Sequence, residues 1–123
     1  MKGKIERTLA TAQRNLDDGD MDGSINQSYY AMFYAAQLYF RERHPNTTSR
    51  IKTHNGTITK FGQLAVQVDR LDPALYAALS QALAARIVSD YDFDDDRLGP
   101  TREFAEEKLR TARWFCRTIL EAM

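Results

Sequence analysis

Apolar residues repeat three or four positions apart along most of the chain, which is the spacing of one face of an α-helix. The first such stripe predicts a helix over residues 4–17 and consists of Ile5, Leu9, Ala12 and Leu16. The polar residues 17–24 follow and include glycine. They predict the end of this helix and supply candidate N-caps for the next one. From Ser24 to Arg43 there is neither glycine nor proline, so the longest helix is predicted over about residues 21–43.

Three more helices are predicted in the rest of the chain. Residues 57–68 carry one stripe, made of Ile58, Phe61, Leu64, Ala65 and Val68. The next helix opens with Asp72 as N-cap and Pro73 in its first turn, and runs to about Tyr91. The last helix, residues 101–121, has Thr101 as cap and Glu103 in its first turn. The polar residues 44–56 are predicted to be a loop.

Five helices in 123 residues, with no β-hairpin signal, predict an all-α protein. We expect an antiparallel four-helix up-and-down bundle with an additional fifth helix packed alongside. The length fits a single domain over residues 1–123.

The charge balance and the cysteine content narrow the class of protein. The 17 basic and 17 acidic side chains argue against a protein that coats nucleic acid or an acidic membrane. Cys116 is the only cysteine, so no intrachain disulfide forms, which fits a reducing compartment. Neither a signal-like N-terminus nor a membrane-spanning stretch is recognisable, and we expect a cytoplasmic protein that does not enter a membrane.

Arg86 interrupts an apolar stripe. On a helical projection Leu79, Leu83 and Arg86 share one narrow arc, with Asp90 one turn further on. A buried guanidinium must be paired and hydrogen-bonded or must face a cleft or a second subunit, because burying it alone costs several kcal/mol or more. Arg86 and Asp90 are therefore either a structural ion pair or part of a functional site.

A second stripe of interest lies on the helix predicted over residues 21–43. Beside its apolar face run polar and aromatic side chains, namely Asn26, Tyr30, Tyr34 and Gln37. Amides and phenols at helical spacing can hydrogen-bond a nucleobase or a phosphate. The alternative is that the rings pack in the core and only their polar tips find partners.

No metal site and no cofactor are predicted. The run Asp92, Asp94 and Asp96 matches the first positions of a calcium loop, but Arg97 stands where the loop requires glycine. We interpret these aspartates as a solvated helix end, with an acidic patch for a basic partner as the alternative. His44, His54 and Cys116 are too few and too scattered for zinc. His54 is either a catalytic base or a loop histidine with a capping role.

Three ordered segments, "NQSYYAMFYAA" (26–36), "KTHNGTITKFGQ" (52–63) and "ARIVSDYDF" (85–93), resemble the HEPN family (higher eukaryotes and prokaryotes nucleotide-binding). The similarity is to its small stand-alone prokaryotic members, the UPF0332 group. It implies a helical bundle, frequently a homodimer, often encoded beside a minimal nucleotidyltransferase in a toxin–antitoxin-like pair.

The resemblance also implies a chemistry. Many members are metal-independent RNases that use an arginine followed, four to six residues later, by a histidine, pooled at the dimer interface. Arg86 takes the arginine position, whereas Tyr91, Asp92 and Phe93 stand near the histidine position, and none replaces imidazole near neutral pH. The resemblance thus favours a protein that is not an enzyme.

Three functions follow from the resemblance and stay open at this point. The first is a nucleotide- or RNA-binding partner of a nucleotidyltransferase, with Arg86 on the phosphate. The second is an RNase that uses Arg86 with Asp90 or His54. The third is a dimeric interaction module. The residues expected to bind the ligand in the first are Asn26, Tyr30, Lys52, His54, Arg86, Asp90 and Tyr91.

Overall fold

The computed structural model describes residues 1–50, 53–91 and 99–123, with the backbone alone for residues 48–50 and 89–91. Within these residues the chain forms five α-helices, a 3₁₀ helix and a π-helix, and no β-strand. In chain order they are α1 (Lys2–Asp17), α2 (Met21–Arg43), η1 (Pro45–Arg50), α3 (His54–Phe61), η2 (Gly62–Val68), α4 (Pro73–Tyr91) and α5 (Arg102–Ala122). The prediction of an all-α helical bundle is confirmed.

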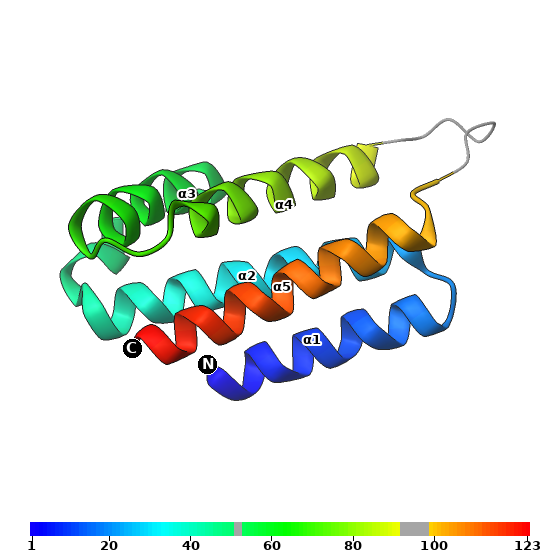
Figure 1. The fold of residues 1–123 in the computed structure, drawn as a ribbon, viewed down its shortest axis with the longest axis horizontal. Coiled ribbons are helices and arrows are strands. Elements are labelled where there is room, and N and C mark those ends of the chain that lie inside the picture. The colour runs from blue at the N-terminus through cyan, green and yellow to red at the C-terminus, as the bar shows by residue number, and fades with distance from the viewer. Residues whose placement is uncertain (51–52, 92–98) are drawn as a thin grey trace.

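Helix α2 is the centre of the bundle, because it contacts each of the other four α-helices. Figure 1 shows α3 and α4 on one side of α2 and α1 on the other. Helix α5 lies beside α2 and runs in the same direction as α2. Helix α3 is the additional short helix, and it packs against α2 and α4. One end of α3 therefore lies close to residues of both α2 and α4.

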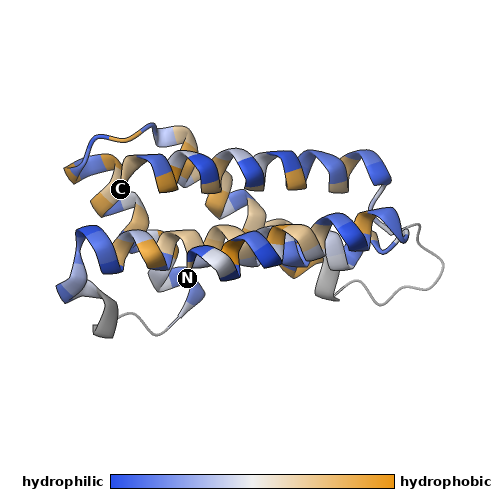
Figure 2. Cartoon of the chain, turned by 90° about the horizontal axis from the view of Figure 1, so that it is seen from below, coloured by the Kyte–Doolittle hydropathy of each residue, from blue (hydrophilic) through white to orange (hydrophobic). Residues whose placement is uncertain are grey.

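Most of the core comes from the stripes that the sequence predicts, although Val68 of the stripe over residues 57–68 is 62% exposed. Ile5, Ala12, Leu75, Leu79 and Ile119 are among its buried members. Figure 2 shows hydrophobic and hydrophilic residues alternating along the long helices, as expected when one face of each helix is buried. Each large apolar side chain buried in this way stabilises the fold by about 1.5–3 kcal/mol.

Short polar side chains begin the helices. The side chain of Asp20 accepts a hydrogen bond from Gly23 N at 2.9 Å, and Thr101 Oγ1 accepts one from Phe104 N at 3.1 Å. Asp72 Oδ1 accepts one from Ala74 N at 2.9 Å, which confirms the predicted start of α4. Each of these bonds satisfies an N–H group that has no partner inside the helix.

The turn between α1 and α2 requires a glycine. Gly19 has a φ of +83°, in the left-handed region where a side chain would be strained. Its N–H donates to Leu16 O at 3.1 Å and closes the end of α1. The next residue, Asp20, then caps α2.

The predicted loop over residues 44–56 is wrong at both ends. Residues 45–50 form η1, and α3 begins at His54, because the side chain of Thr53 caps it by accepting from Gly56 N at 2.9 Å. Gly56 therefore lies inside a helix.

The single helix predicted over residues 57–68 is also wrong in its second half. From Gly62 to Val68 the backbone is a π-helix, which ends where Arg70 takes a φ of 60°. A π-helix is rare and shifts the faces of the residues that follow, which apolar spacing alone does not reveal.

Among the described residues, each helix is too short or too polar to cross a lipid bilayer.

Candidate functional site

Arg86 lies on α4, just beyond the buried Leu79 and Leu83, with its side chain half-buried. Its Nε donates a hydrogen bond to Asn26 Oδ1 at 3.0 Å, although the two residues are 60 positions apart. The guanidinium carbon lies 5.2 Å from the centre of the Tyr30 ring, within the range of a cation–π interaction. Three groups from α2 and α4 thus converge at the point where the apolar stripe of α4 becomes polar.

His54 joins these residues from α3, where it is the first helical residue after the Thr53 cap. Its Nδ1 lies 2.6 Å from the hydroxyl oxygen of Tyr29, in hydrogen-bonding contact. Its ring is stacked on Phe33, with the centroids 4.5 Å apart and the planes at 21°. The imidazole is therefore held on two sides by α2 and is not a freely rotating loop side chain.

Burial and the charge of Arg86 together determine whether the imidazole of His54 is protonated. Burial, and next the positive charge of Arg86, lower the pKa of His54 from its usual 6.5, so the imidazole is neutral at pH 7. Burial raises the pKa of Tyr29 above its usual value, so the phenol keeps its proton. We infer that the phenol donates to Nδ1 and that the imidazole carries its proton on Nε2.

We call this set the Arg86 cluster; it consists of Asn26, Tyr29, Tyr30, Phe33, His54 and Arg86. It brings together four of the residues predicted from the sequence: Asn26, Tyr30, His54 and Arg86. Tyr29 and Phe33 are not among the residues predicted to bind a ligand. Tyr29 is fully buried, and its hydroxyl reaches His54.

The other predicted site residues lie outside the described part of the structure. Lys52 falls between the described ranges, and the side chains of Asp90 and Tyr91 are not among those described. The aspartates of residues 92–96 also lie outside the described ranges. The proposed pair of Arg86 with Asp90 therefore stays a prediction.

The cluster can bind an anion and hold a neutral imidazole next to it. A guanidinium has five N–H donors, so it can serve neighbours in its own chain and a phosphate at the same time. The half-buried rings of Tyr30 and Phe33 offer surfaces on which a base can stack. Among the side chains that the structure describes, no three of His, Cys, Asp or Glu gather where they could hold a metal ion.

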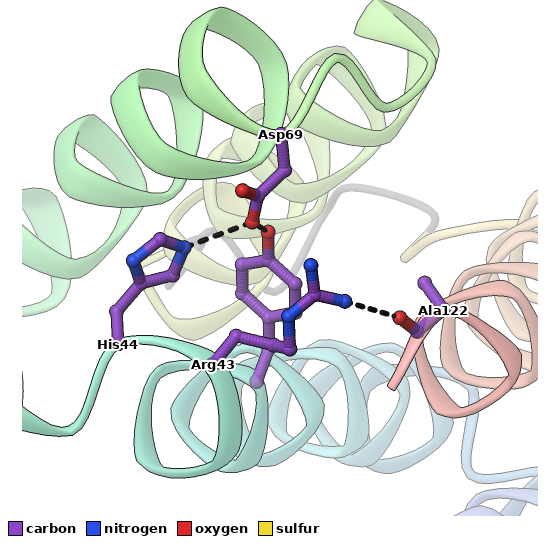
Figure 3. A network of polar contacts seen from close by, with 5 residues as sticks. Arg43, His44, Asp69 and Ala122 are labelled. Carbon is purple, nitrogen blue, oxygen red and sulfur yellow. Dashed lines mark hydrogen bonds and ion pairs between the residues drawn. The ribbon is translucent and has the colours of Figure 1, made fainter.

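A second polar cluster lies at the other end of α2, where Tyr39 is about 20 Å along the helix from Asn26. The carboxylate of Asp69 accepts a hydrogen bond from the buried Tyr39 hydroxyl and lies 2.8 Å from His44 Nε2 (Figure 3). Nearby, Arg43 Nη1 donates to the Ala122 carbonyl oxygen at 2.7 Å. These contacts connect the ends of α2, η2 and α5. His44 therefore lies in a cluster of its own, at the opposite end of α2 from the Arg86 cluster.

Cys116 is buried in α5, and burial raises the pKa of its thiol to about 12. A thiol in this state is protonated and shielded, and it is not a nucleophile.

Known proteins similar to this chain point to one family. The HEPN domain model matches residues 4–122, nearly the whole chain. A UPF0332 protein of Gloeobacter violaceus is 36% identical over 88 residues, which cover 72% of this chain and 67% of the relative. The residues that match the HEPN model include nearly all of α1, the other four α-helices and every member of the Arg86 cluster. This chain therefore belongs to the HEPN-domain family.

Proposed function

We propose that this protein binds a nucleotide or RNA at the Arg86 cluster without cutting it. The observation that carries the proposal is the hydrogen bond between Arg86 and Asn26, which places a guanidinium beside the Tyr30 ring at a half-buried position. The HEPN domain is that of a family of nucleotide-binding, RNA-binding or RNase-like proteins, which supports the same class of ligand.

In this proposal Arg86 pairs with a phosphate and Tyr30 contacts the sugar or base. Asn26 orients the guanidinium, because its amide oxygen accepts a hydrogen bond from Nε. His54, neutral and uncharged, lies at the edge of the cluster. Lys52, Asp90 and Tyr91 remain proposed members of the site.

The partner of this function is proposed to be a minimal nucleotidyltransferase, in a toxin–antitoxin-like pair. The support is the family resemblance together with the sequence after Arg86, where Tyr91, Asp92 and Phe93 stand in place of a histidine. Co-purification of this chain with the product of an adjacent nucleotidyltransferase gene tests the pairing. Failure of the two proteins to associate at micromolar concentration contradicts it.

The binding proposal is tested by thermal shift with nucleotides and with a short RNA. We expect the melting temperature to rise with ligand in the native protein, and we expect Arg86→Ala to abolish the rise. Arg117→Ala is the matched control, because Arg117 is an exposed arginine on α5. Equal shifts in the Arg86→Ala variant and the native protein contradict the proposal.

A second function, RNA cleavage, is favoured by one observation. His54 is a neutral imidazole in the same cluster as Arg86, and its Nδ1 can accept a proton from a ribose hydroxyl once the Tyr29 hydroxyl leaves that nitrogen. Incubation with a mixed RNA pool separates the two functions. Cleavage that is lost in both Arg86→Ala and His54→Gln supports the RNase, whereas intact RNA with a ligand-dependent thermal shift supports binding alone.

The protein is also proposed to be a homodimer. Ile87 and Val88, directly after Arg86 on α4, are 42% and 68% exposed, and apolar side chains at this exposure suit an interface. Val88→Asp is expected to give a monomer by light scattering. If the variant is monomeric and still binds the ligand normally, the site does not require the dimer; if it stays dimeric, this part of α4 is not the interface.

A further inference from the structure

A cavity of about 380 Å³ opens between η2 and the first turns of α4, away from the Arg86 cluster. Its polar lining is Thr59, Gln63 and Gln67, and the ring of Tyr76 forms one wall. All of the lining residues are uncharged. Side-chain amides and a hydroxyl can hydrogen-bond the edge of a nucleobase, and an exposed phenol ring can stack on its face.

The position of Tyr76 depends on Gly62. A Cβ atom built on Gly62 would lie 2.7 Å from Tyr76 Cδ1, so only glycine allows the ring to rest against the η2 backbone. Tyr76 is nevertheless 40% exposed. One part of the ring is therefore supported by the backbone, while another part is available to a ligand.

A stripe of uncharged polar side chains connects this cavity with the Arg86 cluster. Its members recur every four residues from α3 into η2 and are all exposed: Asn55, Thr59, Gln63 and Gln67. Asn55 directly follows His54 of the Arg86 cluster. Because four residues make about one turn in this segment, the stripe follows one side of the helix from one site to the other.

The helical residues between the two sites include no Asp or Glu, and Asp90 of α4 lies one turn beyond Arg86 in the sequence. Residues 54–68 and 73–88 have neither Asp nor Glu, although the chain has 17 acidic side chains. Asp69 and Asp72, between the segments, are engaged with Tyr39 and with the backbone N–H of Ala74. A polyanion that follows the surface therefore meets Lys60 and Arg86 without carboxylates along these segments.

The distance between Tyr76 and Arg86 suits a short single strand of nucleic acid. Tyr76 and Arg86 are ten residues apart on α4, which is about 15 Å at 1.5 Å per residue. A stacked strand advances about 3.4 Å per nucleotide, so about four nucleotide steps cover this distance.

The geometry points to single-stranded RNA as the ligand class, with a phosphate on Arg86 and a base about four nucleotides away in the Tyr76 cavity. This inference rests on the proposed function, because it takes Arg86 as the phosphate site. It adds a second contact, and it predicts that the protein prefers an oligonucleotide to a mononucleotide.

Calorimetric titration with AMP and with an adenosine hexanucleotide tests the inference. We expect the hexanucleotide to bind more tightly than AMP. Tyr76→Ala is expected to weaken hexanucleotide binding about tenfold, since stacking on one aromatic ring typically contributes this much. The same variant should leave AMP binding unchanged. Phe104→Ala is the matched control, because Phe104 is also 40% exposed but lies on α5.

Two further variants guard against a folding defect. Gln63→Glu adds a carboxylate at an exposed position of the cavity and is expected to weaken hexanucleotide binding without loss of helicity. Gly62→Ala displaces the Tyr76 ring and should have the effect of Tyr76→Ala.

The outcomes are distinguishable. If AMP binds through Arg86 but the hexanucleotide gains nothing, or is unaffected by Tyr76→Ala and Gln63→Glu, the inference fails and the proposed function stands. If neither ligand binds, both fail. If Tyr76→Ala changes only self-association in light scattering, a second copy of the chain occupies the cavity and the inference is overturned.

Discussion

Arg86 Nε and Asn26 Oδ1 form a 3.0 Å hydrogen bond that joins α4 to the first turns of α2. The bond connects a charged group at the end of an apolar stripe to a neutral amide. Because the amide is neutral, this bond positions the guanidinium without neutralising its positive charge. The choice of asparagine at position 26 is therefore informative about function.

Asn26→Asp tests this relationship. The substitution keeps the shape but places a carboxylate beside Arg86, so the fold should be equally stable or slightly more stable. Nucleotide affinity should fall about tenfold, because a like charge next to the phosphate costs about 1–2 kcal/mol. Titration calorimetry measures the loss, and Asn26→Ala serves as the uncharged control with a smaller effect. Undiminished affinity in Asn26→Asp would show that the phosphate binds elsewhere.

The stability of the protein should depend on the protonation of His54. The pKa of His54 is lowered in the folded state, so the unfolded chain takes up the proton first as the pH falls. The contribution of His54 is complete above about pH 6.5, the unfolded value, and is lost as the pH falls toward the folded pKa. Urea denaturation from pH 8 to pH 5 measures this, and His54→Gln should give a flatter profile. A profile unchanged by His54→Gln contradicts the assignment.

The effect of Arg86 on that histidine can be measured directly. Arg86→Gln removes the positive charge that helps to lower the pKa of His54, so the pKa should rise. Proton NMR titration of the two histidines reports both values. His44, in the separate Asp69 cluster, is the internal control and should titrate as in the native protein. If only the pKa of His44 changed in Arg86→Gln, the charge of Arg86 would act on His44 and not on His54.

The hydrogen bond between Tyr29 and His54 is expected to stabilise the fold. Tyr29→Phe removes the hydroxyl that lies 2.6 Å from His54 Nδ1 and should lower the free energy of unfolding by about 0.5–1.5 kcal/mol. Chemical denaturation gives the value. Tyr34→Phe, on the half-buried stripe of the same helix, is the control and should cost less. Equal losses in the two variants would mean that the bond to His54 adds nothing.

Asp69 should matter more for stability than the neighbouring Arg43. Asp69→Ala leaves the fully buried Tyr39 hydroxyl without its charged acceptor, at a cost of about 1.5–3 kcal/mol. Arg43→Ala removes an exposed contact to the Ala122 carbonyl and should change stability by about 0.5 kcal/mol or less. Urea denaturation of both variants tests the order, and a larger loss for Arg43→Ala reverses it.

Most of the fold was predictable because the signals that define the helices are local. The stripe that includes Ile5 and Leu9 and the caps at Asp72 and Thr101 each depend on residues within one or two turns. The sequence does not reveal the start of α3, because the residues that follow the Thr53 cap, among them Gly56, are of types common in loops. The hydrophobic spacing does not reveal the π-helix from Gly62, because its hydrogen bonds span only one residue more than those of an α-helix.

The sequence by itself determined the helices, the buried stripes and the exceptional position of Arg86, since each follows from the order of polar and apolar residues along one helix. Only the tertiary structure decided which distant residues meet. Tyr29 contacts His54 across 25 positions and Arg86 contacts Asn26 across 60, because α3 and α4 pack on the same side of α2. Helical periodicity describes one helix at a time, whereas the site arises from the lateral packing of three.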